Sequence, residues 1–226
     1  MKAQTCQTIS TPRRERVLMR ALASARCLVL LCDFAGVDWN TYHAAREQEW
    51  LLPYEGVLRT RLQRHLAGLA RSEPLLELGC GTSDLAAQMH ADGWSAVTAV
   101  DVSRTAVEAA AARFGASPGL RFAVADARDL SPAVPDGSVA AIVDKGTLDA
   151  ICCGEGFDYE AKRVAASLVR ALRPGGVWCC VSLMPPALVL PLVARDEWSE
   201  LRCDEVLLTA NERRLHVYVG EKRAAK

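Results

Sequence analysis

The stretch that decides the fold reads Pro74-Leu75-Leu76-Glu77-Leu78-Gly79-Cys80-Gly81-Thr82-Ser83-Asp84-Leu85. An apolar run with one acidic residue leads into a Gly-x-Gly turn, and a helix-like run over residues 84–90 follows. Strand, glycine turn and helix in this order form the first crossover of a doubly wound sheet, which binds ligands at the carboxyl ends of its strands. The glycines allow positive φ angles and close approach of a ligand to the backbone. An ordinary tight turn between a strand and a helix is the alternative.

The glycine turn favours one class of cofactor over two others. A dinucleotide site requires Gly-x-Gly-x-x-Gly, but Asp84 stands at the third glycine position, where its carboxylate would repel a pyrophosphate. The lysine of a phosphate-binding P-loop is also missing. The remaining pattern, Glu77-x-Gly79-x-Gly81, resembles the first motif of seven-strand S-adenosylmethionine (SAM) methyltransferases. Their sulfonium ligand is cationic, so acidic residues beside the turn are compatible with it.

Length, composition and charge restrict the remaining possibilities. The chain has 226 residues, half of them hydrophobic, which is enough for one larger domain with its own core. The 27 lysines and arginines equal the 27 aspartates and glutamates, which argues against a mainly electrostatic grip on nucleic acid. The sequence contains no run of the roughly 20 apolar residues that a membrane-spanning helix needs.

The nine cysteines do not form the pattern of a disulfide framework. They include two adjacent pairs, Cys152-Cys153 and Cys179-Cys180, and no Cys-x-x-Cys. Neither zinc-ligand spacing nor a catalytic Cys/His signature is present, so we expect no metal site. Unpaired cysteines in this number indicate a reducing compartment.

Residues 1–36 differ in composition from the domain predicted for residues 37–226. They carry six lysines and arginines against only Glu15 and Asp33, and their apolar residues fall on one helical face. This pattern is typical of an organelle transit peptide, and equally of a basic amphipathic helix that packs on the domain. Because the cysteines indicate a reducing compartment, we expect a cytoplasmic protein. The arginine-rich N-terminus makes a mitochondrial or plastid location the alternative.

The rest of the chain alternates between apolar runs and helix-like periodicity. The strands predicted after the first cover residues 97–101, 120–125, 139–143 and 177–183, and residues 203–208 and 215–219 read as a closing hairpin. Helices are expected over residues 55–69, 103–114 and 159–172. The predicted fold class is α/β, a Rossmann-like, mostly parallel seven-strand methyltransferase sheet that ends in an antiparallel hairpin and is flanked by helices. In the dinucleotide fold the last strands would be parallel and need a helix between them.

Acidic residues follow three of these strands. Asp101 lies 24 residues after Glu77, near the spacing of the acid that grips ribose hydroxyls, although a helix-capping role is the alternative. Asp126 is placed to meet the exocyclic amine of adenine, or is a solvated loop acid. Asp144, Lys145 and Asp149 are expected to face the same crevice, with a salt-bridged surface loop as the alternative.

Several of these motifs resemble one family. The chain is similar, over about residues 37–220, to the protein-lysine methyltransferases related to methyltransferase-like protein 13. That group includes the elongation factor 1A lysine methyltransferases and the mitochondrial citrate synthase lysine methyltransferase. The most specific match is Asp144-Lys-Gly-Thr-Leu-Asp-Ala150, and the glycine motif adds to it. An aromatic and arginine motif, Trp39-x-x-Tyr-x-x-x-Arg46 followed by Glu49-Trp50, precedes the core as it does in that group.

The resemblance implies SAM as the cofactor and a protein as the substrate. Gly79 and Gly81 would contact the cofactor through their backbone, Asp101 the ribose, and Asp126 and Ala127 the adenine. Trp39 and Arg46 would close over the methionine end, although His43 interrupts the aromatic motif. Asp144 would line the methyl-transfer channel. The expected cofactor site also includes Glu77, Cys80 and Val102, and the expected catalytic group is Asp144, Lys145 and Asp149.

The predicted reaction is methyl transfer from SAM to a lysine amine of a protein, possible targets being elongation factor 1A and citrate synthase. The amine must be neutral to attack, and free lysine has a pKa of about 10.4. Asp144 or Asp149 would orient the amine or take its proton through water. A small-molecule O- or N-methyltransferase and a catalytically silent SAM-binding module are the two alternatives.

Overall fold

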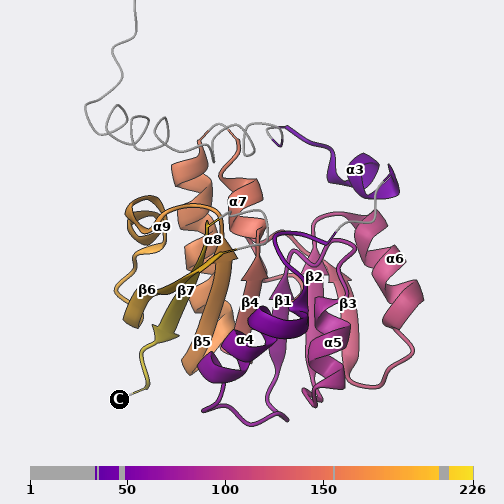
Figure 1. The fold of residues 1–226 in the computed structure, drawn as a ribbon, viewed down its shortest axis with the longest axis horizontal. Coiled ribbons are helices and arrows are strands. Elements are labelled where there is room, and N and C mark those ends of the chain that lie inside the picture. Colours follow the sequence, from indigo (N-terminus) through magenta and orange to yellow (C-terminus); the bar gives the residue numbers. More distant parts are fainter. Residues whose placement is uncertain (1–33, 35, 46–48, 155, 209–213, 226) are drawn as a thin grey trace, which may run out of the picture.

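The glycine stretch folds as predicted, and its strand lies in the interior of a seven-stranded sheet (Figure 1). The computed structural model describes residues 34, 36–45, 49–154, 156–208 and 214–225. The strand order is β3-β2-β1-β4-β5-β7-β6. The strands are β1 (Leu75–Leu78), β2 (Val97–Asp101), β3 (Leu120–Val124), β4 (Val139–Lys145), β5 (Leu172–Ser182), β6 (Trp198–Leu208) and β7 (Arg214–Lys222).

Helices cover both faces of the sheet (Figure 1). They are α3 (Trp39–Ala45), α4 (Arg59–His65), α5 (Leu85–Ala91), α6 (Arg104–Phe114), α7 (Thr147–Ile151), α8 (Phe157–Ala171) and α9 (Pro186–Val193). One apolar cluster packs α8 and α9 against the sheet, and a second packs α4 and α5 against it. The two faces alternate along β5, where Trp178 belongs to the first cluster and Cys179 to the second. This alternation follows from the two-residue period of a strand.

The strand directions confirm the predicted class of fold. β1 pairs in parallel with β2 and β4, β2 with β3, and β4 with β5. β7 pairs antiparallel with β5 and with β6, which closes the sheet with a hairpin. β4 is buried along its whole length, as expected for a parallel strand covered on both faces.

The helix predicted over residues 55–69 is wrong at both ends, because the regular helix α4 covers only Arg59–His65. The segment η2 (Tyr54–Leu58) precedes α4 and is not regular helix, since Glu55 is extended and Gly56 has a φ of 84°. Val57 in this segment is 51% exposed, whereas Leu58, Leu62 and Leu66 are buried on one side. A glycine with positive φ ends the regular periodicity on which the prediction relied.

Two strand boundaries matter for the site. β4 runs to Lys145, two residues beyond the predicted end, so Asp144 and Lys145 belong to the sheet and not to a surface loop. β2 ends at Asp101 as predicted, and Ser103 caps α6 by accepting a hydrogen bond from the amide of Ala106. Arg46, the turn of the closing hairpin and the predicted extension, apart from Phe34 and Gly36, lie outside the described residues.

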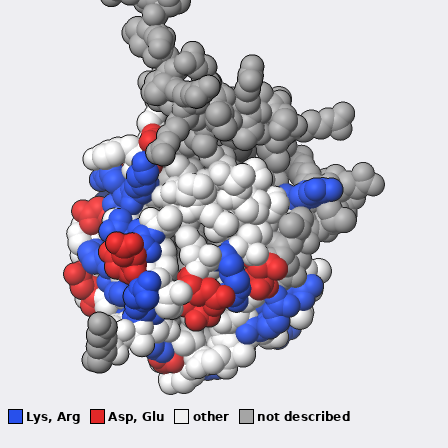
Figure 2. Space-filling view, turned by 90° about the vertical axis from the view of Figure 1, so that its left-hand side faces the viewer, with Lys and Arg blue, Asp and Glu red and all other residues white. Residues whose placement is uncertain are grey.

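Figure 2 shows charges of both signs side by side on the left and lower parts of one face of the molecule, with an uncharged area above them. At the β6 edge of the sheet, Arg202 pairs with both Glu200 and Asp204, and nearby Arg195 pairs with Glu197. Within the described part of the chain, no helix has the length and apolar character to cross a bilayer.

Candidate functional site

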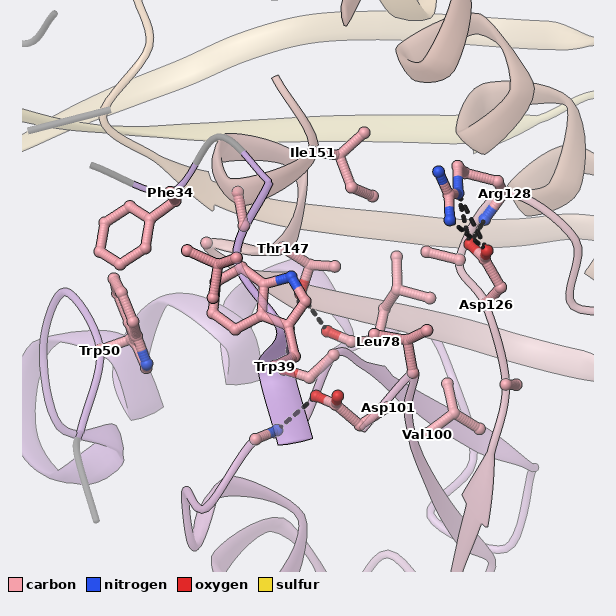
Figure 3. Close-up of a pocket in the computed structure, with 18 of the residues that line it drawn as sticks. Phe34, Trp39, Trp50, Leu78, Val100, Asp101, Asp126, Arg128, Thr147 and Ile151 are labelled. Carbon is pink, nitrogen blue, oxygen red and sulfur yellow. Dashed lines mark hydrogen bonds and ion pairs between the residues drawn. The ribbon is translucent and has the colours of Figure 1, made fainter. Parts of the chain in front are cut away.

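A cavity of about 400 Å³ lies at the carboxyl ends of β1 to β4 (Figure 3). Each of these strands contributes lining residues at or just after its end: Leu78 and Gly79 from β1, Asp101 and Val102 from β2, Asp126 and Ala127 from β3, and Lys145 and Thr147 from β4. Trp39, His43, Trp50 and Phe34 line it from the N-terminal side of the chain. Most of the residues predicted for the site therefore meet at one place.

The glycine turn forms the floor of this cavity. Gly79 and Gly81 have φ angles of 66° and 50°, and a side chain at Gly79 would collide with the Thr147 hydroxyl. That hydroxyl donates a hydrogen bond of 2.7 Å to the carbonyl of Leu78 and so ties the turn to the start of α7. Only glycine fits here, and the turn leaves its backbone open to a ligand.

Asp101 is held in one orientation by backbone amides. Its Oδ2 accepts a hydrogen bond from the amide of Gly81 and its Oδ1 accepts one from the amide of Ser103, each at 2.8 Å. The residue is 7% exposed and lines the cavity beside the glycine turn. A carboxylate oxygen has two lone pairs, so each oxygen can still accept a bond from a ligand hydroxyl.

Asp126 lines the far end of the cavity and is clamped by Arg128 (Figure 3). The backbone amide of Arg128 donates to Oδ1 at 2.9 Å, and its guanidinium Nη2 donates to Oδ2 at 2.6 Å. Burial opposes ionisation, yet the hydrogen bonds from Arg128 hold the pKa of Asp126 below its usual range. Arg128 also contacts Glu160 at 3.3 Å. The Asp126 carboxylate is therefore already paired with a cation of the protein, the Arg128 guanidinium.

Asp144 and Asp149 lie behind the cavity and are absent from its lining. Asp144 is fully buried, and its Oδ1 accepts a hydrogen bond of 2.9 Å from the amide of Thr147. Asp149 accepts from the hydroxyl of Ser182 and, at 2.9 Å, from the amide of Leu183. The expectation that both carboxylates face the crevice is wrong in this respect, because they bind the backbone that holds α7 in place. Their catalytic assignment stays a prediction.

Burial shifts the acid–base properties of these two carboxyl groups. Desolvation, with the charge of Asp149, raises the pKa of Asp144 to about 7. Desolvation also raises the pKa of Asp149 to about 6, although the hydrogen bond from Ser182 works in the opposite direction. Neither group has direct access to a ligand in the cavity.

Lys145 does line the cavity, and its ammonium has partners. Its side chain is 4% exposed and forms an ion pair with Glu49. Its Nζ also donates to the backbone carbonyl of Trp50 at 2.9 Å. Glu49 in turn accepts a hydrogen bond from the hydroxyl of Ser83. These contacts fasten the segment around Trp50 to the ends of β1 and β4.

Glu77 and Cys80 lie beneath the turn and not on the cavity lining. Burial raises the pKa of Glu77 to about 8, with the charge of Lys145 opposing the shift. Burial also raises the pKa of the Cys80 thiol well above its usual value. Both residues were predicted for the cofactor site, and that assignment stays a prediction.

The aromatic residues form a connected cluster at the mouth of the cavity. Trp39 stacks on Phe34 with ring centroids 5.9 Å apart, and Trp50 meets Phe34 edge-on at 5.1 Å. Tyr42 joins Trp39 at 5.4 Å. The high density of aromatic residues around Trp39 and Trp50 was the signal in the sequence, whereas Phe34 stood in the predicted extension and was missed.

His43 and Arg128 are further lining residues that the sequence did not identify. A side chain at Gly81 would lie 3.1 Å from Cε1 of His43, so the edge of the imidazole that carries both nitrogens faces the glycine turn. His43 is buried, and desolvation lowers its pKa although the charge of Asp101 opposes the shift. In the described part of the chain, no group of three or more His, Cys, Asp or Glu side chains is arranged to hold a metal ion.

Comparisons with known proteins agree with this geometry. Residues 75–176 match the family described as a methyltransferase domain. EEF1A lysine methyltransferase 4 from Mus musculus is 32% identical over 141 residues, covering 58% of this chain and 54% of that protein. The protein of the same name from Bos taurus is 39% identical over 129 residues, covering 55% of this chain and 48% of that protein. The chain thus spans about half the length of these curated relatives.

A solved structure shares the fold. The N-methyltransferase NodS from Bradyrhizobium japonicum WM9, determined with S-adenosyl-L-homocysteine, matches with a TM-score of 0.62 and 18% identity. The match covers 82% of this chain and 99% of that one. At this identity the comparison shows the fold of the sheet and its helices alone.

Proposed function

We propose that this chain, which carries a methyltransferase domain and is related to the EEF1A lysine methyltransferases, moves a methyl group from SAM to a lysine side chain of a protein. The observation that carries the proposal is the paired placement of the glycine turn and Asp101. The turn offers open backbone at the end of β1, and the Asp101 carboxylate is fixed beside it by the amides of Gly81 and Ser103.

The lining residues fit SAM in the order in which the strands present them. Asp101 would hold the ribose hydroxyls, and Gly79 and Gly81 would lie along the methionine part. Val102 and Ala127 would flank the adenine ring, and the ion pair of Asp126 with Arg128 would leave its carboxylate a minor role there. Trp39 would cover the methionine end. Arg46, predicted to assist it, lies outside the described residues.

The cofactor supplies a methyl group on a sulfonium, which is already a good leaving group. The protein therefore has to position the acceptor amine and exclude water. Because Asp144 and Asp149 do not reach the cavity, we assign them to holding the turn between β4 and α7. Lys145 holds the Trp50 segment through its bond to that residue's carbonyl.

A protein substrate is supported by the names of the relatives. We propose a translation elongation factor of the eEF1A class as the first target to test, with citrate synthase as the second. The two targets belong to different compartments, so identifying the substrate also tests the cytoplasmic location that we propose.

The proposal is tested by incubating the purified protein and radiolabelled SAM with lysate from cells that lack this protein, followed by separation by size. We expect label in a protein band that mass spectrometry identifies as an elongation factor with methylated lysine. Label confined to the small-molecule fraction would instead support the alternative small-molecule enzyme. Binding of SAM without any transfer would support the silent module.

A further inference from the structure

The strand ends that line the cavity follow one another across the sheet in the order β3, β2, β1 and β4. Neighbouring strands are about 4.8 Å apart, so the ends of β3 and β4 are separated by about 14 Å. If the adenine lies at β3, the ribose at β2 and the methionine part at β1, as proposed above, then the next place in the row is the end of β4. The group that accepts the methyl must enter there.

This β4 end of the cavity is mostly apolar and aromatic, and the one charged group of its described lining is the Lys145 ammonium, which is paired with Glu49. Figure 3 shows Phe34 and Trp50 together at one end, while Asp126 and Arg128 lie at the other. Thr147, Ala150 and Ile151 from α7 complete the wall. Trp50 and Phe34 are both half-buried and both line the cavity.

Three contacts fix Trp50 at the end of β4. Lys145 Nζ donates to its carbonyl at 2.9 Å, and the ion pair between Lys145 and Glu49 holds the preceding residue. The side chain of Leu51 packs over Gly146, where a Cβ would meet it at 3.5 Å. The aromatic wall is therefore part of the folded site.

We infer that the surface formed by Phe34, Trp50, Thr147 and Ile151 receives the side chain of the acceptor lysine. This inference rests on the proposed function. A lysine side chain is a stem of four methylene groups with a terminal amine, and such stems pack well along apolar surfaces. The aromatic rings offer that surface next to the place of the transferable methyl group.

The charges around this end favour the reactive, neutral form of the amine. Its described lining contains no carboxylate, because the carboxylates that line the cavity, Asp101, Asp126 and Glu160, follow β2 and β3 or belong to α8. Glu49, just outside, is paired with Lys145. An ammonium group that enters loses water without gaining a partner of opposite charge, and this lowers its pKa.

The transfer step then needs no protein base at this position. The amine nitrogen gives its electron pair to the methyl carbon as the bond between that carbon and sulfur breaks, and the electron pair of that bond stays on sulfur. The nitrogen releases its extra proton to water at the cavity mouth.

The test uses binding, so it does not depend on knowing the protein substrate. Two ligands are compared by calorimetry: S-adenosylhomocysteine, and an analogue in which a nitrogen replaces the sulfur and carries a four-carbon aminoalkyl chain. We expect the analogue to bind the wild-type protein at least about tenfold more tightly, because its chain lies along Trp50.

Substitutions of Trp50 test whether this residue causes the higher affinity of the analogue. In Trp50→Ala the affinity for S-adenosylhomocysteine should stay within about twofold of wild type, while the advantage of the analogue disappears. Trp50→Phe, which keeps an aromatic ring and guards against misfolding, should retain part of that advantage. Tyr159→Ala, which removes an aromatic ring that is 63% exposed on α8, is the matched control and should behave as wild type.

The outcomes separate this inference from the proposed function. Failure of the wild-type protein to bind S-adenosylhomocysteine would overturn both. Binding of that ligand with no advantage for the aminoalkyl analogue would overturn the inference alone. An advantage that persists in Trp50→Ala, or an equal loss of both affinities, would show that Trp50 does not receive the chain.

Discussion

Asp101 and Asp144 each lie at the carboxyl end of a parallel strand, yet only Asp101 lines the cavity. The register explains the difference, because Leu78, the last residue of β1, is level with both Val100 and Asp144. Asp101 is one residue beyond that level, where β1 has already turned away. Asp144 lies within the sheet, between β1 and Cys180 of β5. A carboxylate inside the sheet must find its partners in the backbone, whereas one beyond it can face a ligand.

The largest expected effect is the loss of SAM affinity when Asp101, the carboxylate that lines the cavity, is replaced. Asp101→Ala removes the acceptor proposed for the ribose hydroxyls, and hydrogen bonds to a charged group contribute about 1.5–3 kcal/mol each. We expect SAM affinity to fall at least about 100-fold in calorimetry. Asp158→Ala, an exposed acid on α8, is the control. Unchanged affinity in the folded Asp101 variant would remove the assignment to ribose.

The buried acid should show the reverse pattern, with a loss of stability and little loss of SAM binding. Asp144→Ala leaves the partly buried amide of Thr147 without its acceptor, which costs about 1–2 kcal/mol in the free energy of unfolding. Turnover should also fall because the turn at Gly146 and Thr147 loosens. Asp144→Asn keeps an acceptor oxygen and should lose much less.

Urea unfolding with and without SAM checks this second prediction. A variant Asp144→Ala as stable as wild type would show that the hydrogen bond to Thr147 carries little free energy. A loss of SAM affinity as large as that of Asp101→Ala would show that Asp144 takes part in binding the ligand.

Asp101 and Asp144 also differ in how well the sequence predicted their positions. The glycine turn, the alternation of strands and helices and the ends of β1 and β2 follow from local patterns, and they placed Asp101 correctly. The apolar run of residues 139–143 gave no sign that β4 continues through Asp144 and Lys145. Burial of a charged residue in a strand depends on neighbours distant in sequence, here Leu78 and Cys180.

The unforeseen parts of the site come from side-chain pairing across long sequence distances. Lys145 meets Glu49, 96 residues earlier, and the resulting ion pair places Trp50 at the end of β4. The pairing of Asp126 with Arg128 is local, and an acid followed two residues later by arginine was a signal that could have been used. The position of His43 over Gly81 depends on how α3 packs, which no local pattern specifies.

A third effect concerns pH. The pKa values of Asp144 and Asp149 are raised in the folded protein to about 7 and about 6, so the folded state binds more protons than the unfolded state between about pH 4 and 7. Their contribution to stability is therefore fully present below the unfolded pKa and is lost as pH rises through the folded values. One such group contributes at most about 1.4 kcal/mol per pH unit in this range.

The measurement is the free energy of unfolding in urea at pH 5 and pH 7.5, for wild type and for Asp144→Asn. We expect the difference between the two pH values to shrink in the variant, because its amide does not titrate. An identical pH dependence in both proteins would mean that Asp144 keeps an ordinary pKa in the fold.

The smallest effect is expected at the third strand end, where Asp126 faces the cavity but is already neutralised. Its carboxylate accepts bonds from the amide and the guanidinium of Arg128, so little of it is free for adenine. Asp126→Asn should change the affinity for S-adenosylhomocysteine by less than about threefold, or about 0.7 kcal/mol. Its effect on stability should stay below about 1 kcal/mol, since the ion pair is more than a third exposed. A loss comparable to that of Asp101→Ala would show that Arg128 leaves Asp126 when the ligand binds, and the two acids would then act alike.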